Sequence, residues 1–291
     1  MGGVIVLPFE EWTARRDAHA ADVDALLRDH LERRRRGQRH PVEDFLFEYY
    51  SHRPGQLRRW HPGASVVLAG ARPEDFPGHH RVEGGVALDL DAFLARRGDT
   101  LRWVRDLLAA TATRPAQLGC FGLHEWAMVY RSDEVRHTTW PLRLGPERTN
   151  AVVEERGVRC SHFDAFRFFT EPARPLNVLQ PRRETQTQLE QPGCLHATMD
   201  LYKWAYKLTP LTPSELVLDC FRLARDVREL DMRASPYDFS ALGYVPVPIE
   251  TPEGRAEYVA AQRTFAERGT ALRSRLLAVC ARALTDEPAS A

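Results

Sequence analysis

Residues 194–232, CLHATMDLYKWAYKLTPLTPSELVLDCFRLARDVRELDM, decide the fold class. Apolar residues recur at helical spacing in the first part, which predicts a helix over residues 194–208 that Pro210 ends. Thr212-Pro213-Ser214-Glu215 then forms a capping box with proline at the first helical position. This pattern predicts a second helix that runs to about Met232. Two long helices in succession favour a mainly α protein.

The flanking segments extend the helical pattern. Residues 9–36 carry apolar side chains at roughly helical intervals, end in four arginines and are followed by Gly37. They predict a long helix whose basic end suits the helix dipole. Thr251-Pro252-Glu253 opens a last helix, which we expect to break at Gly269. The sequence therefore predicts a single helical domain over residues 1–285 and a disordered tail at 286–291.

Two segments interrupt the helices. Between residues 62 and 90, the short runs Val66-Val67-Leu68 and Val86-Ala87-Leu88 stand among glycines, prolines and histidines. They predict a small β-hairpin insert. Residues 132–193 contain six prolines and a polar stretch, which predicts a long loop. Loops of this length in a domain commonly carry function.

Composition limits the class of protein. The 291 residues contain 40 basic and 40 acidic side chains, and 43% of the residues are hydrophobic. This balance excludes a disordered, collagen-like or strongly basic chain. The only N-terminal apolar run, residues 4–7, is too short for a signal peptide, and no apolar stretch is long enough to span a membrane. We therefore expect a cytoplasmic protein without a membrane partner, in which the five cysteines are free thiols.

Histidine, carboxylate and aromatic side chains cluster in four segments, around residues 120–126, 160–166, 194–204 and 219–231. Burying such polar groups without partners costs about 1–3 kcal/mol each. These groups must therefore be paired or used in a site. The sequence leaves open whether the segments converge, and a shared pocket with His124, His162, His196 and Asp226 would support a site.

The third segment has the most specific spacing. His196, Asp200, Lys203 and Lys207 stand at positions i, i+4, i+7 and i+11, on one stripe of a helix. The stripe is either a solvated face with ordinary ion pairs or a site. The two lysines are the only ones among 40 basic residues. A lysine amine can be desolvated and act as a nucleophile or base, whereas the arginine guanidinium cannot.

Metal binding is one interpretation of these segments. The candidate ligands, all of types that bind iron or zinc, are His124, Glu125, His162, Asp164, His196 and Asp200. The spacing lacks a CxxC, an HExxH or the Glu-x-x-His pairs of di-iron bundles. Structural histidines, and a closed zinc site formed by the neighbouring cysteines and histidines, are the alternatives. No G-x-S-x-G, Walker A or G-x-G-x-x-G motif is present, which disfavours serine hydrolases and nucleotide-cofactor enzymes.

Several stretches resemble a family of actinobacterial proteins of similar length that are labelled 3-methyladenine DNA glycosylase. The resemblance rests on residues 162–170 (HFDAFRFFT), 194–207 (CLHATMDLYKWAYK) and 230–238 (LDMRASPYD). It extends to residues 40–51 and 58–63, and so covers nearly the whole chain. The resemblance implies removal of alkylated bases from DNA by hydrolysis of the N-glycosidic bond, without a cofactor.

Such a reaction needs a carboxylate beside an aromatic pocket for the extruded base. Asp200 or Asp164 is the candidate carboxylate, and His196 or His162 its partner. Lys203 is a candidate nucleophile for an additional lyase step. The candidate substrate-binding residues are Trp204, Tyr202, Trp126, Tyr50, Arg58 and Arg59.

Two alternatives remain beside the glycosylase. One is an iron- or zinc-dependent enzyme that acts on a small molecule through the histidine and carboxylate cluster. The other is a non-catalytic module that binds DNA or a partner through Arg53, Arg58 and Arg59 among the aromatic residues 45–60. A helix with inward aromatics covered by arginines would explain that last segment without any ligand.

Overall fold

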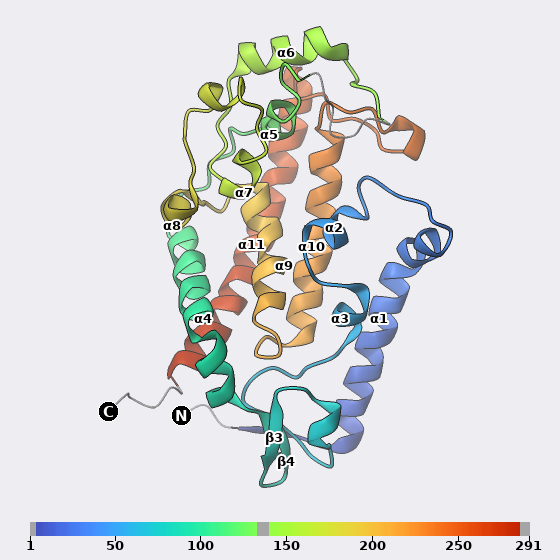
Figure 1. Ribbon diagram of the computed structural model, residues 1–291, viewed down its shortest axis with the longest axis vertical. Coiled ribbons are helices and arrows are strands. Elements are labelled where there is room, and N and C mark those ends of the chain that lie inside the picture. The colour runs from blue at the N-terminus through green and yellow to red at the C-terminus, as the bar shows by residue number, and fades with distance from the viewer. Residues whose placement is uncertain (1–3, 133–139, 286–291) are drawn as a thin grey trace. The chain divides into compact units, whose positions relative to one another are not determined.

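The computed structural model describes residues 4–132 and 140–285 (Figure 1). The predicted tail at 286–291 lies outside these residues. The structure is 60% helical, and its described part contains eleven α-helices and one four-stranded sheet. The prediction of a mainly α fold with a small β insert is confirmed.

The chain forms two compact units. Unit 1 comprises residues 1–108, 201–222 and 272–291, and unit 2 comprises residues 109–200 and 223–271. Four helices of the described chain have residues in both units: α4 (Leu90–Ala112), α9 (Leu195–Lys207), α10 (Ser214–Arg233) and α11 (Pro252–Thr285). The assignment of residues 1–285 to a single domain stays a prediction.

The other elements of unit 1 are β1 (Ile5–Leu7), α1 (Phe9–Arg35), α2 (Phe45–Tyr49), α3 (Pro54–Arg58), β2 (Val66–Leu68), β3 (His79–Val82) and β4 (Gly85–Leu88). Those of unit 2 are α5 (Leu123–Ala127), α6 (Gly145–Arg156), α7 (Phe163–Phe166) and α8 (Gln186–Leu189).

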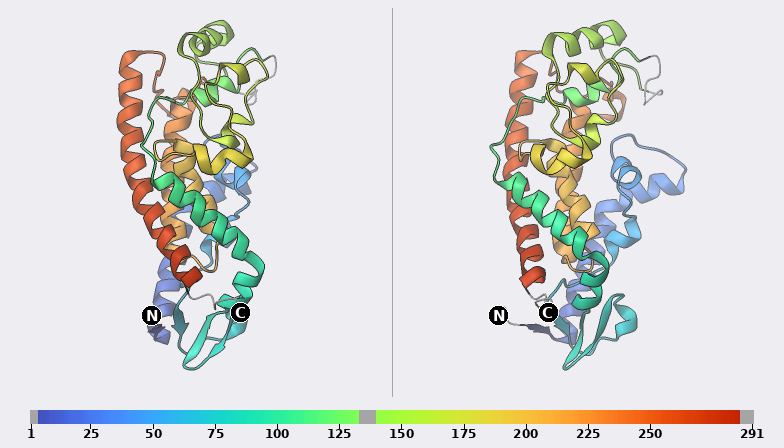
Figure 2. Two further views of the ribbon diagram at one scale, coloured as in Figure 1. Left: turned by 90° about the vertical axis from the view of Figure 1, so that its left-hand side faces the viewer. Right: turned by 60° about the vertical axis from the view of Figure 1, so that its left-hand side comes forward.

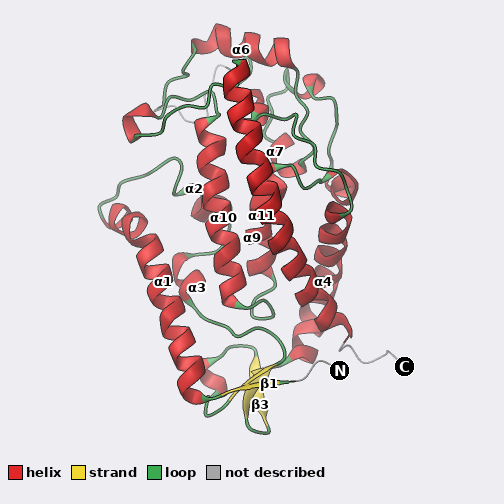
Figure 3. Ribbon diagram, turned by 180° about the vertical axis from the view of Figure 1, so that it is seen from behind, coloured by secondary structure: helices red, strands yellow, loops and turns green. Residues whose placement is uncertain are grey.

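The sheet of unit 1 has the strand order β1-β2-β4-β3 and lies beside the N-terminal end of α1 (Figures 1 and 3). Strands β3 and β4 form a hairpin, with Val82 opposite Gly85. The two runs that the sequence marked are β2 and β4. β2 adds to it antiparallel to β4, and β1 pairs parallel to β2 with Ile5 opposite Val66. The apolar run at residues 4–7 thus contributes an edge strand. Trp12 of α1 packs against the sheet and donates its indole N–H to the carbonyl of Ala69 at 2.9 Å.

Within unit 2, the segments of α9, α10 and α11 lie side by side (Figures 1 and 3). The predicted break at Gly269 is wrong, because α11 is one continuous helix (Figure 2). A Cβ on Gly269 would lie 3.0 Å from Cγ2 of Thr198 on α9. The glycine therefore allows two helices to approach closely, a role that sequence reasoning mistook for a helix end.

The long loop predicted for residues 132–193 is wrong in part. Helix α6 occupies Gly145–Arg156, and the short helices α7 and α8 also lie in this range. Pro146 stands in the first turn of α6, where it removes no helical hydrogen bond, and Glu147 suits the positive helix end. The proline starts a helix here and does not interrupt one.

A turn around Gly193 positions the start of α9. Gln191 accepts hydrogen bonds through Oε1 from the amides of Gln117 (2.8 Å) and Gly193 (2.7 Å). The side-chain amide of Gln262 donates to the Gly193 carbonyl at 2.6 Å. A Cβ on Gly193 would lie 2.6 Å from the backbone oxygen of Gln117. Only glycine fits this contact.

We predict that Gly193→Ala lowers the free energy of unfolding by about 1–3 kcal/mol, because the backbone must move away from the added methyl group. Gly55→Ala is the matched control, since nothing lies within 4 Å of its Cβ position in α3. Urea denaturation should show unchanged or slightly higher stability for the control. Equal stability of the two variants would contradict the close contact at Gly193.

Candidate metal centre

Seven histidine and carboxylate side chains from separate segments meet inside unit 2. They form two groups, in each of which the ligand atoms lie within 4.8 Å of one another. The His124 group consists of His124, Glu125, His196 and Asp231, and the His162 group consists of His162, Glu190 and Asp200. Every one of these residues is buried. The three histidine segments therefore converge within this unit.

Local structure explains how these side chains come together. His124 and Glu125 lie on the one-turn helix α5, whose five residues are all buried. His196 and Asp200 stand four residues apart on α9 and so project to the same side of that helix. Asp231 lies on the face of α10 that also buries Ala224 and Val227.

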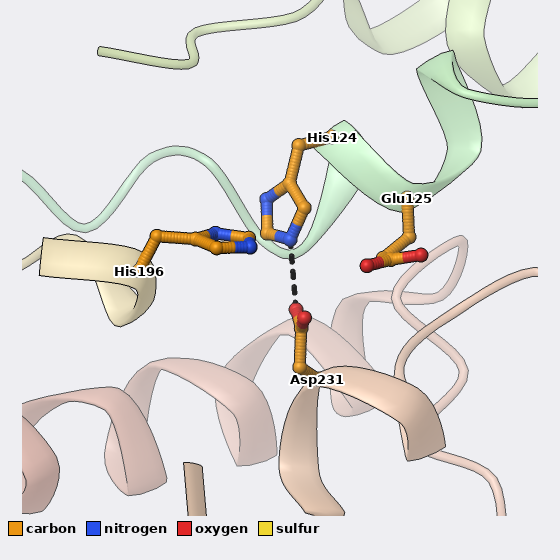
Figure 4. Close-up of side chains that lie close together, drawn as sticks. All are labelled: His124, Glu125, His196 and Asp231. Carbon is orange, nitrogen blue, oxygen red and sulfur yellow. Dashed lines mark hydrogen bonds and ion pairs between the residues drawn. The ribbon is translucent and has the colours of Figure 1, made fainter. Parts of the chain in front are cut away.

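A buried ion pair organises the His124 group. Nε2 of His124 lies 2.8 Å from Oδ1 of Asp231 (Figure 4). Burial alone would lower the pKa of His124, but the Asp231 carboxylate and the Cys120 side chain outweigh it and raise that pKa well above its usual value. Burial would likewise raise the pKa of Asp231, but His124 lowers it below its usual range. The pair is therefore an imidazolium and a carboxylate in this structure.

Arg228 contacts the same group from the next turn of α10. One guanidinium nitrogen lies 3.2 Å from Oε1 of Glu125 and 3.5 Å from Oδ2 of Asp231. Buried charges require such partners, because an unpaired charge in the interior is strongly destabilising. Two carboxylates thus face two cations, Arg228 and the protonated His124.

His196 links the two groups. Its ring packs edge-on against His124, with centroids 4.4 Å apart, and stacks on His162 at 5.2 Å. Its ring forms no hydrogen bond or ion pair with any described residue, although the residue is only 7% exposed. Burial, and then the charge of His124, lower the pKa of His196 well below its usual value. It is a neutral imidazole, and one ring nitrogen carries a lone pair.

The His162 group has wider spacing. Nε2 of His162 lies 3.4 Å from Oε1 of Glu190 and 3.4 Å from Oδ2 of Asp200. Two ligands about 2.1 Å from one ion at the tetrahedral angle are about 3.4 Å apart. Gln186, one turn before Glu190, donates to the same Oε1 at 2.5 Å. Nδ1 of His162 accepts the amide of Ala165 at 3.3 Å and so caps α7, which leaves the proton of a neutral ring on Nε2.

A small cavity adjoins His124. It is lined by Cys120, Cys160, Cys194 and Tyr258, among others, and offers about 10 Å³ to the centre of a water-sized sphere. This is room for about one water molecule. All five cysteines of the chain are free thiols, as predicted. None belongs to either ligand group in the described part of the chain, and burial raises the pKa of Cys160 and Cys194, so both stay protonated.

The predicted site residues divide into two sets. Those that the structure brings together are His124, Glu125, His162, His196 and Asp200. The acids Asp164 and Asp226 lie in neither group and pair with arginines: Asp164 lies 3.4 Å from Arg167 and Asp226 2.7 Å from Arg268. Asp226 thus lies outside both ligand groups.

The predicted lysine stripe is not a single site. Lys203 is half-buried and Lys207 is exposed. Their Nζ atoms lie 4.5 and 5.6 Å from the ring centroid of Trp204. This packing of both lysines on one indole explains them without a reaction.

Most of the predicted substrate-binding side chains are structural. Trp126 is fully buried and donates its indole N–H to the carbonyl of Ala234. Tyr50 and Tyr202 pack edge-on against each other in the core of unit 1. Arg58 pairs with Asp24 at 2.8 and 3.0 Å. Arg59, in contrast, lines a cavity of unit 1.

Sequence reasoning missed three members of the cluster. Asp231 was noted among the available acids but was not assigned to the site, although it is an acid on the apolar face of α10. Glu190 stands between two prolines in a segment without periodicity, so nothing in the sequence marked it. Arg228 was one of many arginines.

Comparison of the chain with models of protein families, with curated proteins and with solved structures gave no significant match. In the described residues, no helix combines the length and the apolar character that a membrane crossing requires. The site is therefore interpreted from its own chemistry.

We predict that Asp231→Asn lowers the free energy of unfolding by about 3–5 kcal/mol, because Arg228 and His124 lose a buried counter-charge. Asp226→Asn on the same helix is the matched control. It breaks only a partly exposed pair with Arg268 and should cost less than about 1 kcal/mol. Urea denaturation in the presence of EDTA measures both. A similar loss in the two variants would contradict the importance of the buried pair.

Proposed function

We propose that unit 2 binds an iron or zinc ion in the His124 group and that the protein is a metal-dependent enzyme acting on a small molecule. One observation supports this most strongly: two imidazole and two carboxylate ligand atoms, all buried, lie within 4.8 Å of one another. Buried clusters of this composition either pair internally or coordinate a metal. Iron and zinc are the ions that accept a mixed set of nitrogen and oxygen ligands.

The state of each ligand supports this proposal. His196 is already neutral, so its lone pair can bind an ion directly. His124 holds a proton that an ion would displace, and binding would therefore release it. The ion would then take over the charge compensation that this proton gives to Asp231.

Two neighbouring side chains contact the proposed ligands and would not bind the ion themselves. Sγ of Cys120 lies 3.4 Å from Nδ1 of His124, and Arg228 contacts both carboxylates of the group. Partners of this kind orient ligands and tune their basicity. The His162 group, with its 3.4 Å spacings, offers a second position next to His196.

The cavity at Cys120 and His124 limits the size of the molecule that could bind beside the proposed ion. It has room for about one water molecule beside a ligand of the proposed ion. A bound iron or zinc ion would supply Lewis acidity to such a water or to a small polar substrate.

The DNA-base glycosylase activity implied by the resemblance stays a prediction. An extruded base needs a pocket of ligand size, about 300 Å³ or more, whereas the cavity beside His124 admits about one water molecule. The buried carboxylates therefore lack room for a base in this conformation.

Elemental analysis of the untagged protein tests the proposal. We expect near-stoichiometric iron or zinc in the wild type and less than about a tenth of it in His196→Ala. The loss of a ring without hydrogen bonds should leave the fold intact, which circular dichroism can verify. His80→Ala is the matched control, because His80 is exposed on β3 and outside both ligand groups.

Two results would overturn the proposal. One is a wild-type protein that binds neither iron nor zinc after reconstitution. The other is undiminished metal in a folded His196→Ala. Release of 3-methyladenine from alkylated DNA by metal-free protein would instead support the glycosylase.

A further inference from the structure

Unit 1 contains a second polar cavity, which the proposed metal centre does not involve. We call it the His52 pocket. Its polar lining residues are His52, Gln56, Arg59, His61, Thr209 and Ser214, and it offers about 70 Å³ to the centre of a water-sized sphere. This volume is several times the volume that one water molecule needs by the same measure.

His52 is the central polar group of the pocket. Its ring stacks on Tyr206, with centroids 4.6 Å apart and planes 17° apart. The residue is only 6% exposed, and its ring forms no hydrogen bond with any described residue. A buried imidazole without a partner costs free energy, so a ligand that hydrogen-bonds to it would recover that cost.

His61 joins the pocket to the start of α10. Its backbone amide donates to Oγ of Ser214 at 2.8 Å, and its carbonyl accepts the Ser214 amide at 3.0 Å. The residue is 9% exposed, and Nδ1 of its ring has no hydrogen-bond partner. Two lining histidines, each at least nine-tenths buried, thus have unused hydrogen-bonding capacity.

The charges around the pocket are positive. Arg59 forms no ion pair with any described residue, in contrast to Arg58, which Asp24 holds. Burial lowers the pKa of His52 to about 4. Burial, followed by the charges of His79, Arg59, His19 and His52, lowers the pKa of His61 to about 4, and no carboxylate counteracts them.

Glu215 is an acid in the first turn of α10. Its Oε1 accepts hydrogen bonds from Arg15 and from the indole of Trp60, both at 2.9 Å, whereas its buried Oε2 has no hydrogen-bond partner in the described chain. The amides of Leu216 and Val217 bond to the Pro213 carbonyl. The helix therefore contributes its positive dipole end to the pocket but no free amides in these positions.

The alternative of a metal ion is disfavoured by spacing. Five buried histidines, at positions 19, 30, 52, 61 and 79, lie in unit 1. No three of them bring ligand atoms within 4.8 Å of one another in the described chain. A lone arginine, imidazoles and a positive helix end are instead the groups that bind oxyanions.

We infer that the His52 pocket binds a phosphate group, as the free ion or as the monoester of a small molecule, through Arg59, His52 and His61. The guanidinium donates to the oxyanion, and the imidazoles add N–H donors. Binding of the anion stabilises the protonated imidazoles, so the protein takes up protons with the ligand above about pH 4, where both rings are neutral without it.

Isothermal titration with inorganic phosphate and with glycerol phosphate distinguishes the two sources. We expect saturable binding of at least one of them, weakened about tenfold or more in Arg59→Gln, since a charge-assisted hydrogen bond is lost. Arg58→Gln is the matched control, because Arg58 is adjacent in sequence but pairs with Asp24 outside the lining of the pocket. Its affinity should equal that of the wild type.

The pH dependence gives an independent measurement. Without ligand, His52 and His61 titrate at about 4 in the folded protein and near 6.5 when unfolded. The unfolded chain thus binds more protons in this range, and stability falls as the pH drops from 6.5 to 4. Saturating phosphate should reduce this fall in the wild type and in Arg58→Gln, and by less in Arg59→Gln.

Three results would overturn the inference. One is the absence of saturable heat with either phosphate compound at pH 5.5. Another is equal affinity in Arg58→Gln and Arg59→Gln. The third is salt-dependent binding of a single-stranded oligonucleotide that both substitutions weaken alike, which would indicate an exposed nucleic-acid surface and not a pocket.

Discussion

The buried pair of His124 and Asp231 is the constraint on which the interior of unit 2 depends. A carboxylate can remain ionised inside a protein only when opposite charge and hydrogen bonds replace its water. The 2.8 Å contact meets that requirement for Asp231, and Arg228 meets it for Glu125. His196 of α9 packs its ring against the His124 ring of this pair. An ion at this position would replace one positive charge by another, so the ionised carboxylates would keep their compensation.

His52 and His61 of unit 1 show the opposite solution to burial. They have no carboxylate partner among the described residues, and burial keeps them neutral. The same residue type therefore holds charge at position 124 and loses it at positions 52 and 61. The difference lies in the neighbours: an aspartate beside His124, and an arginine with further histidines beside His61. This difference in neighbours makes the His124 group suited to cations and the His52 pocket suited to anions.

The fold was predictable where local chemistry determines it. The capping box before α10 and the apolar spacing of α1 and α9 predicted these helices, because both signals lie within a few residues of the helix itself. Gly269 misled, since its role depends on Thr198 in a distant segment. The site was predictable in its histidines, which are rare and stand in unusual apolar surroundings. Glu190 was not, because a single acid in a proline-flanked segment has no pattern, and only the folded chain places it beside His162.

His162 serves two structural purposes at once. Its Nδ1 caps α7 through the Ala165 amide, while Nε2 faces Glu190 and Asp200. Any ligand that takes the lone pair of Nε2 shifts the ring to the other tautomer and turns the capping acceptor into a donor. The amide of Ala165 then loses its bond, and a helix of only four residues has little else to hold its first turn. Hydrogen exchange at this single amide therefore reports the occupancy of a cluster that is buried from solvent.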